Sequence, residues 1–294
     1  MAKVPEEWNV LSMLEWGTEY FEGKGIPNPR LSIEWLLADV LKIKRLDLYL
    51  QFDRPLSSEE LKDIKSGILR RARHEPLQYI VGHTDFMNAH INVSPDVLVP
   101  RPETEQLVEI VLEQNQNDSQ KRVLDIGTGS GCIAIALKQE RSSWRLYGLD
   151  ISNQALKLAR ENAQLNEVEV AFFSGDIQHP EKIEFPEEPF FDIIVSNPPY
   201  ITPQERSTLD PEVREFEPGR ALFHKDIFTL YRDIATFAFG HLNPGGSLYL
   251  EINEAYGQEL QRLFDNQKWQ TDLKQDYGGK DRFIICHKGL DKLN

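Results

Sequence analysis

A predicted strand that ends at two prolines carries the residues with the clearest chemistry in this chain. Residues 191–196 form an apolar, β-branched run typical of a buried parallel strand, and Asn197-Pro198-Pro199-Tyr200 follows directly. Proline lacks an N–H and keeps the residue before it extended, so we expect Asn197 and Pro198 to hold carbonyl groups that no sheet ladder uses. An Asn side-chain oxygen and a backbone carbonyl can accept both hydrogens of one –NH2 group, while the Tyr200 ring offers a flat apolar face.

Such a pair of acceptors suits a reaction at a planar nitrogen. An amide or exocyclic amino nitrogen is a poor nucleophile because its lone pair is delocalised. Holding both of its hydrogens favours a pyramidal nitrogen aimed at an electrophile, and this requires no ionisable base. Taken alone, these four residues are equally well explained as a polyproline turn that leaves a strand. The neighbouring motifs decide between the two interpretations.

A glycine-rich loop, Asp125-Ile126-Gly127-Thr128-Gly129-Ser130-Gly131-Cys132, lies where the predicted strand 123–125 turns into the predicted helix 133–138. Glycines at such a turn let a ligand approach the backbone. The Gly-x-Gly-x-x-Gly dinucleotide pattern fails from Gly127, although from Gly129 it would end on a tolerated alanine, so spacing alone is weak evidence. The Asp125 carboxylate would repel a pyrophosphate, whereas it suits the ammonium and sulfonium charges of S-adenosylmethionine.

Two further acids follow the next two predicted strands. Asp150 ends the strand 146–150, where a carboxylate can accept hydrogen bonds from both ribose hydroxyls. Asp176 follows the strand 168–173 and is expected to receive the adenine amino group, with Ile177 against the ring. Each acid alone could be a helix cap or a turn residue. The ordered series of glycine loop, two acids and Asn197 at four successive strand ends instead predicts one cofactor site, which Asn197 borders.

The elements that must position these residues form a predicted α/β domain. After residue 120, strands expected at 123–125, 146–150, 168–173, 193–195, 248–252 and 283–286 alternate with helices, which is typical of a doubly wound, Rossmann-like sheet. Residues 8–73 show helical periodicity with a capping box at Ser57 and Glu60, and predict a small helical bundle. We interpret its arginine cluster, Arg70, Arg71 and Arg73, as a solvated helix face. Residues 86–99 alternate like a β-hairpin.

We therefore predict an N-terminal helical domain at 1–76, a β-hairpin linker at 77–102 and a catalytic domain at 103–294. The helical domain is interpreted as a recognition domain for a macromolecular substrate. The net charge of the 294 residues is −14, and residues 101–294 carry −11 of it, which argues against a nucleic-acid partner. The two cysteines lack metal-type spacing, and no signal region or membrane span is evident, so we expect no metal, no membrane and a cytoplasmic location.

With these motifs in view, the chain resembles the release factor glutamine methyltransferases, the PrmC/HemK family, over nearly its whole length. The motifs that carry the resemblance are Pro100-Arg101-Pro102-Glu103-Thr104-Glu105, the loop 125–131, Asn197-Pro198-Pro199-Tyr200 and Glu217-Pro218 with Ala221-Leu222. The resemblance implies a class I S-adenosylmethionine-dependent methyltransferase domain behind a small N-terminal helical bundle. It also implies methylation of the glutamine side-chain amide in the Gly-Gly-Gln motif of class 1 peptide chain release factors, with S-adenosylhomocysteine as the product.

By position, the resemblance assigns cofactor binding to Gly127, Gly129, Gly131, Asp150 and Asp176, and the loop residues Thr128 and Ser130 belong to the same segment. It assigns the glutamine amide to Asn197 and Pro198, with Pro199 and Tyr200 beside it. Residues 223–228 lack glycines expected in the family, and Asn253 replaces one. Two alternatives remain open: an adenine amino methyltransferase that acts on RNA or DNA with the same tetrapeptide, and a protein that binds the cofactor without turnover.

Overall fold

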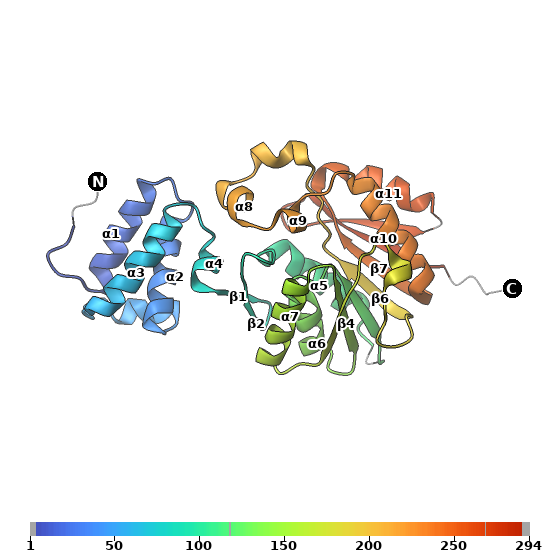
Figure 1. Ribbon diagram of the computed structural model, residues 1–294, viewed down its shortest axis with the longest axis horizontal. Coiled ribbons are helices and arrows are strands. Elements are labelled where there is room, and N and C mark those ends of the chain that lie inside the picture. Colours follow the sequence, from blue (N-terminus) through green and yellow to red (C-terminus); the bar gives the residue numbers. More distant parts are fainter. Residues whose placement is uncertain (1–3, 118, 268, 290–294) are drawn as a thin grey trace. The chain divides into compact units, whose positions relative to one another are not determined.

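The computed structural model describes residues 4–117, 119–267 and 269–289, and the chain divides into two compact units (Figure 1). One unit consists of Met1–His83 with Leu209–Phe216, and the other of Thr84–Thr208 with Glu217–Asn294. Each unit buries an apolar core of its own. Within the described ranges, no helix is both long and apolar enough to cross a membrane.

The first unit is the predicted helical bundle. Its helices are α1 (Val10–Glu22), α2 (Pro29–Leu41), η1 (Arg45–Leu50), α3 (Ser58–Arg71) and α4 (Leu77–Val81). The helices bury their apolar faces around Leu14, Phe21, Ile33 and Ile64. The capping box predicted at Ser57 is present, since its hydroxyl accepts from the Glu60 N–H and the Glu60 carboxylate accepts from the Ser57 N–H.

The solvated arginine face expected on α3 is wrong for Arg71. This side chain is buried, and its guanidinium donates to the Ser32 hydroxyl, the Glu75 carbonyl and the Glu212 carboxylate. Glu212 lies on α8 (Pro211–Phe216), a segment that clusters with the helical unit although the chain on both sides of it belongs to the other unit. A buried cation requires such a partner, which helical periodicity cannot reveal.

The second unit contains the predicted doubly wound sheet, with strand order β5-β4-β3-β6-β7-β9-β8. The parallel strands are β3 (Arg122–Ile126), β4 (Arg145–Asp150), β5 (Val170–Ser174), β6 (Phe191–Ser196) and β7 (Leu242–Glu251). β9 (Asp281–His287) pairs antiparallel with β7 and with β8 (Gln270–Gln275). The strand order reverses between β3 and β6, where α/β sheets bind their ligands.

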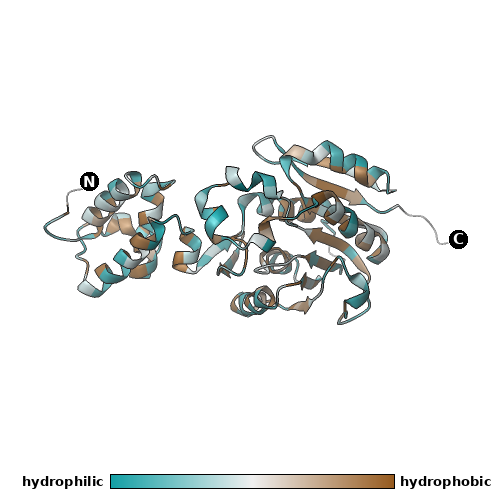
Figure 2. Cartoon of the chain, turned by 45° about the horizontal axis from the view of Figure 1, so that its top comes forward, coloured by the Kyte–Doolittle hydropathy of each residue, from teal (hydrophilic) through white to brown (hydrophobic). Residues whose placement is uncertain are grey.

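Helices cover both faces of this sheet. α10 (Ile227–His241) and α11 (Gly257–Asp265) share one apolar core with alternate strand residues such as Leu124 and Leu250. The opposite face carries α5 (Pro102–Gln114), α6 (Cys132–Glu140) and α7 (Asn153–Leu165). Figure 2 shows that the central strands are among the most hydrophobic parts of the unit. This agrees with strands that are buried on both faces.

A hairpin of β1 (His83–Phe86) and β2 (Ala89–Asn92) is present, but it begins and ends earlier than the predicted range 86–99. Asn162 of α7 and Asn166, the C-cap of that helix, hold it in place. The Asn166 side chain accepts from the His90 N–H at 3.0 Å and donates to the His90 carbonyl at 2.8 Å. Asn162 repeats this arrangement on Asn92, at 2.9 and 3.0 Å, and also donates to the Ser130 carbonyl at 2.9 Å. The chain after β2 is thereby tied to the glycine loop.

Candidate active site

A cavity of about 580 Å³ lies at the carboxyl ends of β3, β4, β5 and β6, entirely within the second unit. Its walls are the loops that follow these strands, together with residues from the segments 95–101 and 218–224. Cavities of this size hold nucleotide-sized ligands. The predicted site residues that line it are Gly127, Thr128, Gly129, Ser130, Asp150, Asp176, Ile177, Asn197, Pro198 and Pro199. Among the residues that the structure describes, Asp125, Gly131 and Tyr200 are the predicted ones that do not.

The glycine loop takes a conformation that other residues rarely adopt. Gly127, Gly129 and Gly131 have φ angles of 73°, 54° and 84°. The N–H groups of Gly127 and Thr128 both donate to the Leu149 carbonyl, at 2.8 and 3.0 Å, which joins the loop to β4. Gly131 caps α6, and a Cβ atom there would lie 3.1 Å from the Ala159 Cβ. Gly131 therefore allows close packing of the loop rather than direct access to the cavity.

Asp150 connects the glycine loop to the segment that follows β4. Its two carboxylate oxygens accept from the N–H groups of Gly129 and Ser152, at 2.9 and 2.8 Å. Burial raises the pKa of Asp150, and the hydrogen bonds from these N–H groups oppose that shift. Each oxygen keeps a lone pair for a ligand hydroxyl. Asp176 accepts from the Gln178 N–H at 2.9 Å, which leaves its other oxygen for the cavity.

Asp125 lies behind the loop instead of beside the ligand space. It is completely buried, and one of its oxygens accepts from the Thr128 hydroxyl at 2.6 Å. Burial raises the pKa of Asp125 to about 7, although the Thr128 hydrogen bond lowers it. The carboxyl group therefore shapes the loop from within. Its position does not support the direct contact with ligand charges that the sequence predicts.

The residues 197–200, which we call the acceptor corner, follow β6 as predicted. The Ser196 hydroxyl donates to the Ile126 carbonyl at 2.7 Å and fixes the end of β6 beside β3. The Asn197 amide nitrogen donates to the Thr104 hydroxyl oxygen at 2.9 Å. The Tyr200 hydroxyl donates to a Glu251 carboxylate oxygen at 2.9 Å, and the other oxygen of that group accepts from the Thr104 hydroxyl at 2.7 Å. Tyr200 thus points into the protein.

Two motifs that the sequence singled out meet at this corner. Arg101 lines the cavity and forms an ion pair with Glu217, whose side chain is buried. Thr104, three residues further on, contacts Asn197. The segments 100–105 and 217–222 therefore form one support for the acceptor corner. The sequence marked both segments as distinctive but contained no local signal for these partners.

The departures from the family pattern also have a structural explanation. The Asn253 amide nitrogen donates to the Tyr200 carbonyl and to the Glu205 carboxylate, both at 3.2 Å, so the side chain replacing glycine ties the acceptor corner to the next segment. In the stretch 223–228, Asp226 caps α10 by accepting from the Thr229 N–H at 3.0 Å. Neither departure removes a residue from the cavity.

Comparison with known proteins agrees with this architecture. Residues 12–82 match the model of the PrmC N-terminal domain, and residues 103–211 match that of the methyltransferase small domain. A protein of Geobacter sulfurreducens is 39% identical over 97% of this chain and 98% of its own, and one of Lactococcus lactis is 41% identical over 86% and 92%. Both are named release factor glutamine methyltransferase.

A solved structure supports the fold separately. The crystal structure of a methyltransferase from Pyrococcus furiosus superposes with a TM-score of 0.51 at 17% identity, and covers 79% of this chain and 100% of that one. At this identity the likeness concerns the fold alone, and it agrees with the match to the methyltransferase small domain.

Proposed function

The chain belongs to the release factor glutamine methyltransferase family, and we propose from its site how it performs that reaction. It is an enzyme that transfers a methyl group from S-adenosylmethionine to the side-chain amide nitrogen of a release factor glutamine. One observation supports the assignment of the site above all others. Asn197 and Pro198, which are uncharged acceptors, line the same cavity as the glycine loop and Asp150.

The cofactor half of the cavity fits S-adenosylmethionine, which supplies a methyl group on a positively charged sulfur. We propose that residues 127–130 cradle it with their backbone and that Asp150 accepts from its ribose hydroxyls. Asp176 would accept from the adenine amino group, with Ile177 along the ring. Gly131 and Asp125 contribute indirectly, because they hold the loop in its conformation. Asn197 would border the methyl group from the other side.

The acceptor corner then orients the glutamine amide. Asn197 Oδ1 and the Pro198 carbonyl oxygen would accept its two N–H hydrogens, Pro199 would form the adjacent wall, and Tyr200 would hold the corner through Glu251. A nitrogen–methyl bond forms while the carbon–sulfur bond breaks to leave S-adenosylhomocysteine. The nitrogen gives up one hydrogen to water as a proton, because an amide protonated on nitrogen is a strong acid. This scheme uses neither a metal ion nor an ionisable base.

The substrate and its recognition are further parts of the proposal. We infer that the methylated residue is the glutamine of the Gly-Gly-Gln motif in class 1 release factors. We also infer that residues 1–76 recognise the release factor, that 77–102 form the linker and that 103–294 catalyse transfer. The net charge of −11 on residues 101–294 supports a protein substrate without nucleic-acid contact, and no membrane partner is needed. Translation terminates in the cytoplasm, where we place the enzyme.

Transfer of a labelled methyl group tests this assignment. The chain is incubated with methyl-labelled S-adenosylmethionine and purified release factor, and in parallel with RNA and DNA. We expect label in the release factor, located by peptide mapping at the Gly-Gly-Gln glutamine and absent from a matched release factor with alanine at that position. Label in RNA or DNA with unlabelled release factor would instead establish the adenine alternative, and cofactor binding without product would establish a binding protein.

A further inference from the structure

We propose that Thr104 determines which way the Asn197 side-chain amide faces, and that Glu251 holds Thr104 in this role. The inference rests on the proposed function, in which Asn197 Oδ1 accepts a hydrogen from the substrate amide. Thr104 also lines the cavity, but its hydroxyl bonds to Asn197 and Glu251, so it would be a positioning residue. Its effect on the substrate would pass through the Asn197 side chain.

The problem that Thr104 solves is the near symmetry of an asparagine amide. The oxygen and the –NH2 group have similar shapes, and rotation about χ2 exchanges them, so only hydrogen-bond partners can set the orientation. If the amide were reversed, its –NH2 group would face the –NH2 group of the substrate glutamine. Two donors would then oppose each other, and the Pro198 carbonyl would be left as a single acceptor. The orientation of Asn197 is therefore a requirement of the reaction.

The hydroxyl of Thr104 has one hydrogen, and its two polar neighbours determine where that hydrogen points. Thr104 Oγ1 lies 2.7 Å from Glu251 Oε2 and 2.9 Å from Asn197 Nδ2. With Glu251 ionised, its carboxylate can only accept, so the hydroxyl donates to Glu251 and presents only lone pairs to Asn197. Those lone pairs favour the amide nitrogen. The direction of donation, from Asn197 through Thr104 to Glu251, leaves Asn197 Oδ1 for the cavity.

Glu251 is itself fixed on several sides. Its other carboxylate oxygen accepts from the Tyr200 hydroxyl at 2.9 Å, and its backbone carbonyl accepts from the Tyr231 hydroxyl at 2.8 Å. Burial raises the pKa of Glu251, while the bonds from Thr104 and Tyr200 and the charge of Arg282 lower it. Arg282 is in turn paired with Glu254 and Asp276, at 3.0 and 3.1 Å. The carboxylate therefore cannot swing away from Thr104.

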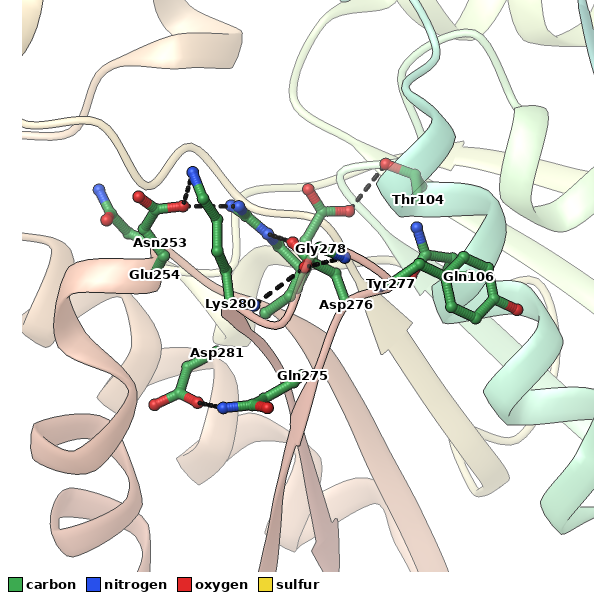
Figure 3. A network of polar contacts seen from close by, with 12 residues as sticks. Thr104, Gln106, Asn253, Glu254, Gln275, Asp276, Tyr277, Gly278, Lys280 and Asp281 are labelled. Carbon is green, nitrogen blue, oxygen red and sulfur yellow. Dashed lines mark hydrogen bonds and ion pairs between the residues drawn. The ribbon is translucent and has the colours of Figure 1, made fainter.

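Water has little access to the bond between Thr104 and Glu251. Thr104 is 3% and Glu251 1% exposed, and both sit on rigid elements, the first turn of α5 and the last residue of β7. Pro100 and Pro102 stiffen the entry to that first turn. In Figure 3, Thr104 projects from α5 toward the polar network around the β8–β9 turn. In a dry site, the loss of one partner is not compensated by solvent.

A double-mutant cycle tests the inference. We expect Thr104→Val, which keeps the shape and removes the hydroxyl, to lower kcat about 10- to 100-fold, as a misplaced reacting group would. Its dissociation constant for S-adenosylhomocysteine should stay within about twofold of the wild-type value. The matched variant Thr104→Ser keeps the hydroxyl and should restore most of the lost kcat. Thr104→Ala should repeat the loss seen with valine, which guards against a packing defect peculiar to one variant.

The second arm of the cycle introduces these changes into Asn197→Ala. If Thr104 acts only through Asn197, Thr104→Val should change the kcat of that variant by less than about twofold. A full additional loss in the Asn197→Ala background, or an undiminished kcat in Thr104→Val, would overturn the inference. An inactive wild type with release factor would instead refute the proposed function, so the two failures are distinguishable. Rates are normalised to the fraction of protein that binds S-adenosylhomocysteine, which excludes unfolded chains.

Discussion

The cofactor half of the cavity is built from backbone groups close together in sequence, whereas the acceptor corner is held by side chains from distant parts of the chain. Asp150 fixes the Gly129 N–H from 21 residues away, and Ser152 contacts Asp150 from two. Asn197 instead depends on Thr104, 93 residues away, and Thr104 on Glu251, 147 residues away. The first half should therefore respond to variants through cofactor affinity, and the second through turnover.

The largest effect is expected at the acceptor corner itself. Asn197→Ala removes an oriented acceptor that is needed only for the reacting nitrogen, so kcat should fall about 10²- to 10³-fold, as when one oriented polar contact is lost elsewhere. The affinity for S-adenosylhomocysteine, measured by calorimetry, should stay close to wild type. A variant that lost cofactor affinity instead would show that the two halves are not separate in function.

Asp150→Ala should give the opposite pattern. It removes the acceptor for the N–H groups of Gly129 and Ser152 and for the proposed ribose hydroxyls. Hydrogen bonds to a charged group contribute about 1.5–3 kcal/mol each. Cofactor affinity should therefore fall at least tenfold, while kcat at saturating S-adenosylmethionine stays near wild type. If kcat fell and the dissociation constant for the cofactor did not change, the proposed division between the two halves of the cavity would be wrong.

Asp125 provides a test by pH, because it supports the loop from within. The folded pKa of about 7 lies above the ordinary value of 3.8, so the folded protein holds a proton that the unfolded chain releases between these values. Stability from this group is thus present at low pH and is lost as pH rises toward 7. Between pH 5 and 7 the loss is on the order of 2 kcal/mol, or several degrees in Tm.

The measurement compares thermal unfolding of the wild type and Asp125→Asn across this range. Asparagine keeps an acceptor for Thr128 and carries no charge. The Tm of the variant relative to wild type should therefore rise from pH 5 to 7 and change little above pH 8. A difference in Tm between the two proteins that stays the same at every pH would mean that Asp125 ionises normally in the folded protein.

The smallest effect is expected for Tyr200→Phe. The ring remains, and Thr104 still fixes Asn197, so only one hydroxyl bond to Glu251 is lost. We expect kcat to fall less than about tenfold, with cofactor affinity unchanged. Steady-state kinetics with release factor would decide this, and a fall as large as that of Asn197→Ala would make Tyr200 a direct participant in the reaction.

The same division explains what could be predicted from the sequence. The glycine loop, Asp150, Asp176 and Asn197 each stand at the end of an apolar run, and a doubly wound sheet brings such ends together, so local patterns were sufficient. Strand β8 was missed because its sequence, Gln270–Gln275, is largely polar at the sheet edge. The partners of Asn197 could not be predicted, since no local pattern encodes a contact between α5 and β7.

The sequence also could not show which charged side chains are buried. Asp125 and Arg71 carry charges, and their positions next to a loop and on a helix face suggested contact with ligand or solvent. Both are enclosed with a polar partner, which is Thr128 of the same loop for one oxygen of Asp125 and Glu212 from a distant segment for Arg71. Sequence periodicity shows which face of an element is apolar, but it does not show which polar residue is enclosed with a partner.

The most direct test of the account is a crystal structure of the enzyme with S-adenosylhomocysteine and a release factor. We predict that the nitrogen of the Gly-Gly-Gln glutamine lies at hydrogen-bond distance, about 2.7–3.2 Å, from both Asn197 Oδ1 and the Pro198 carbonyl oxygen, with the cofactor sulfur on its open side. A glutamine amide bound elsewhere in the cavity, or an Asn197 that presents its nitrogen to the substrate, would contradict it.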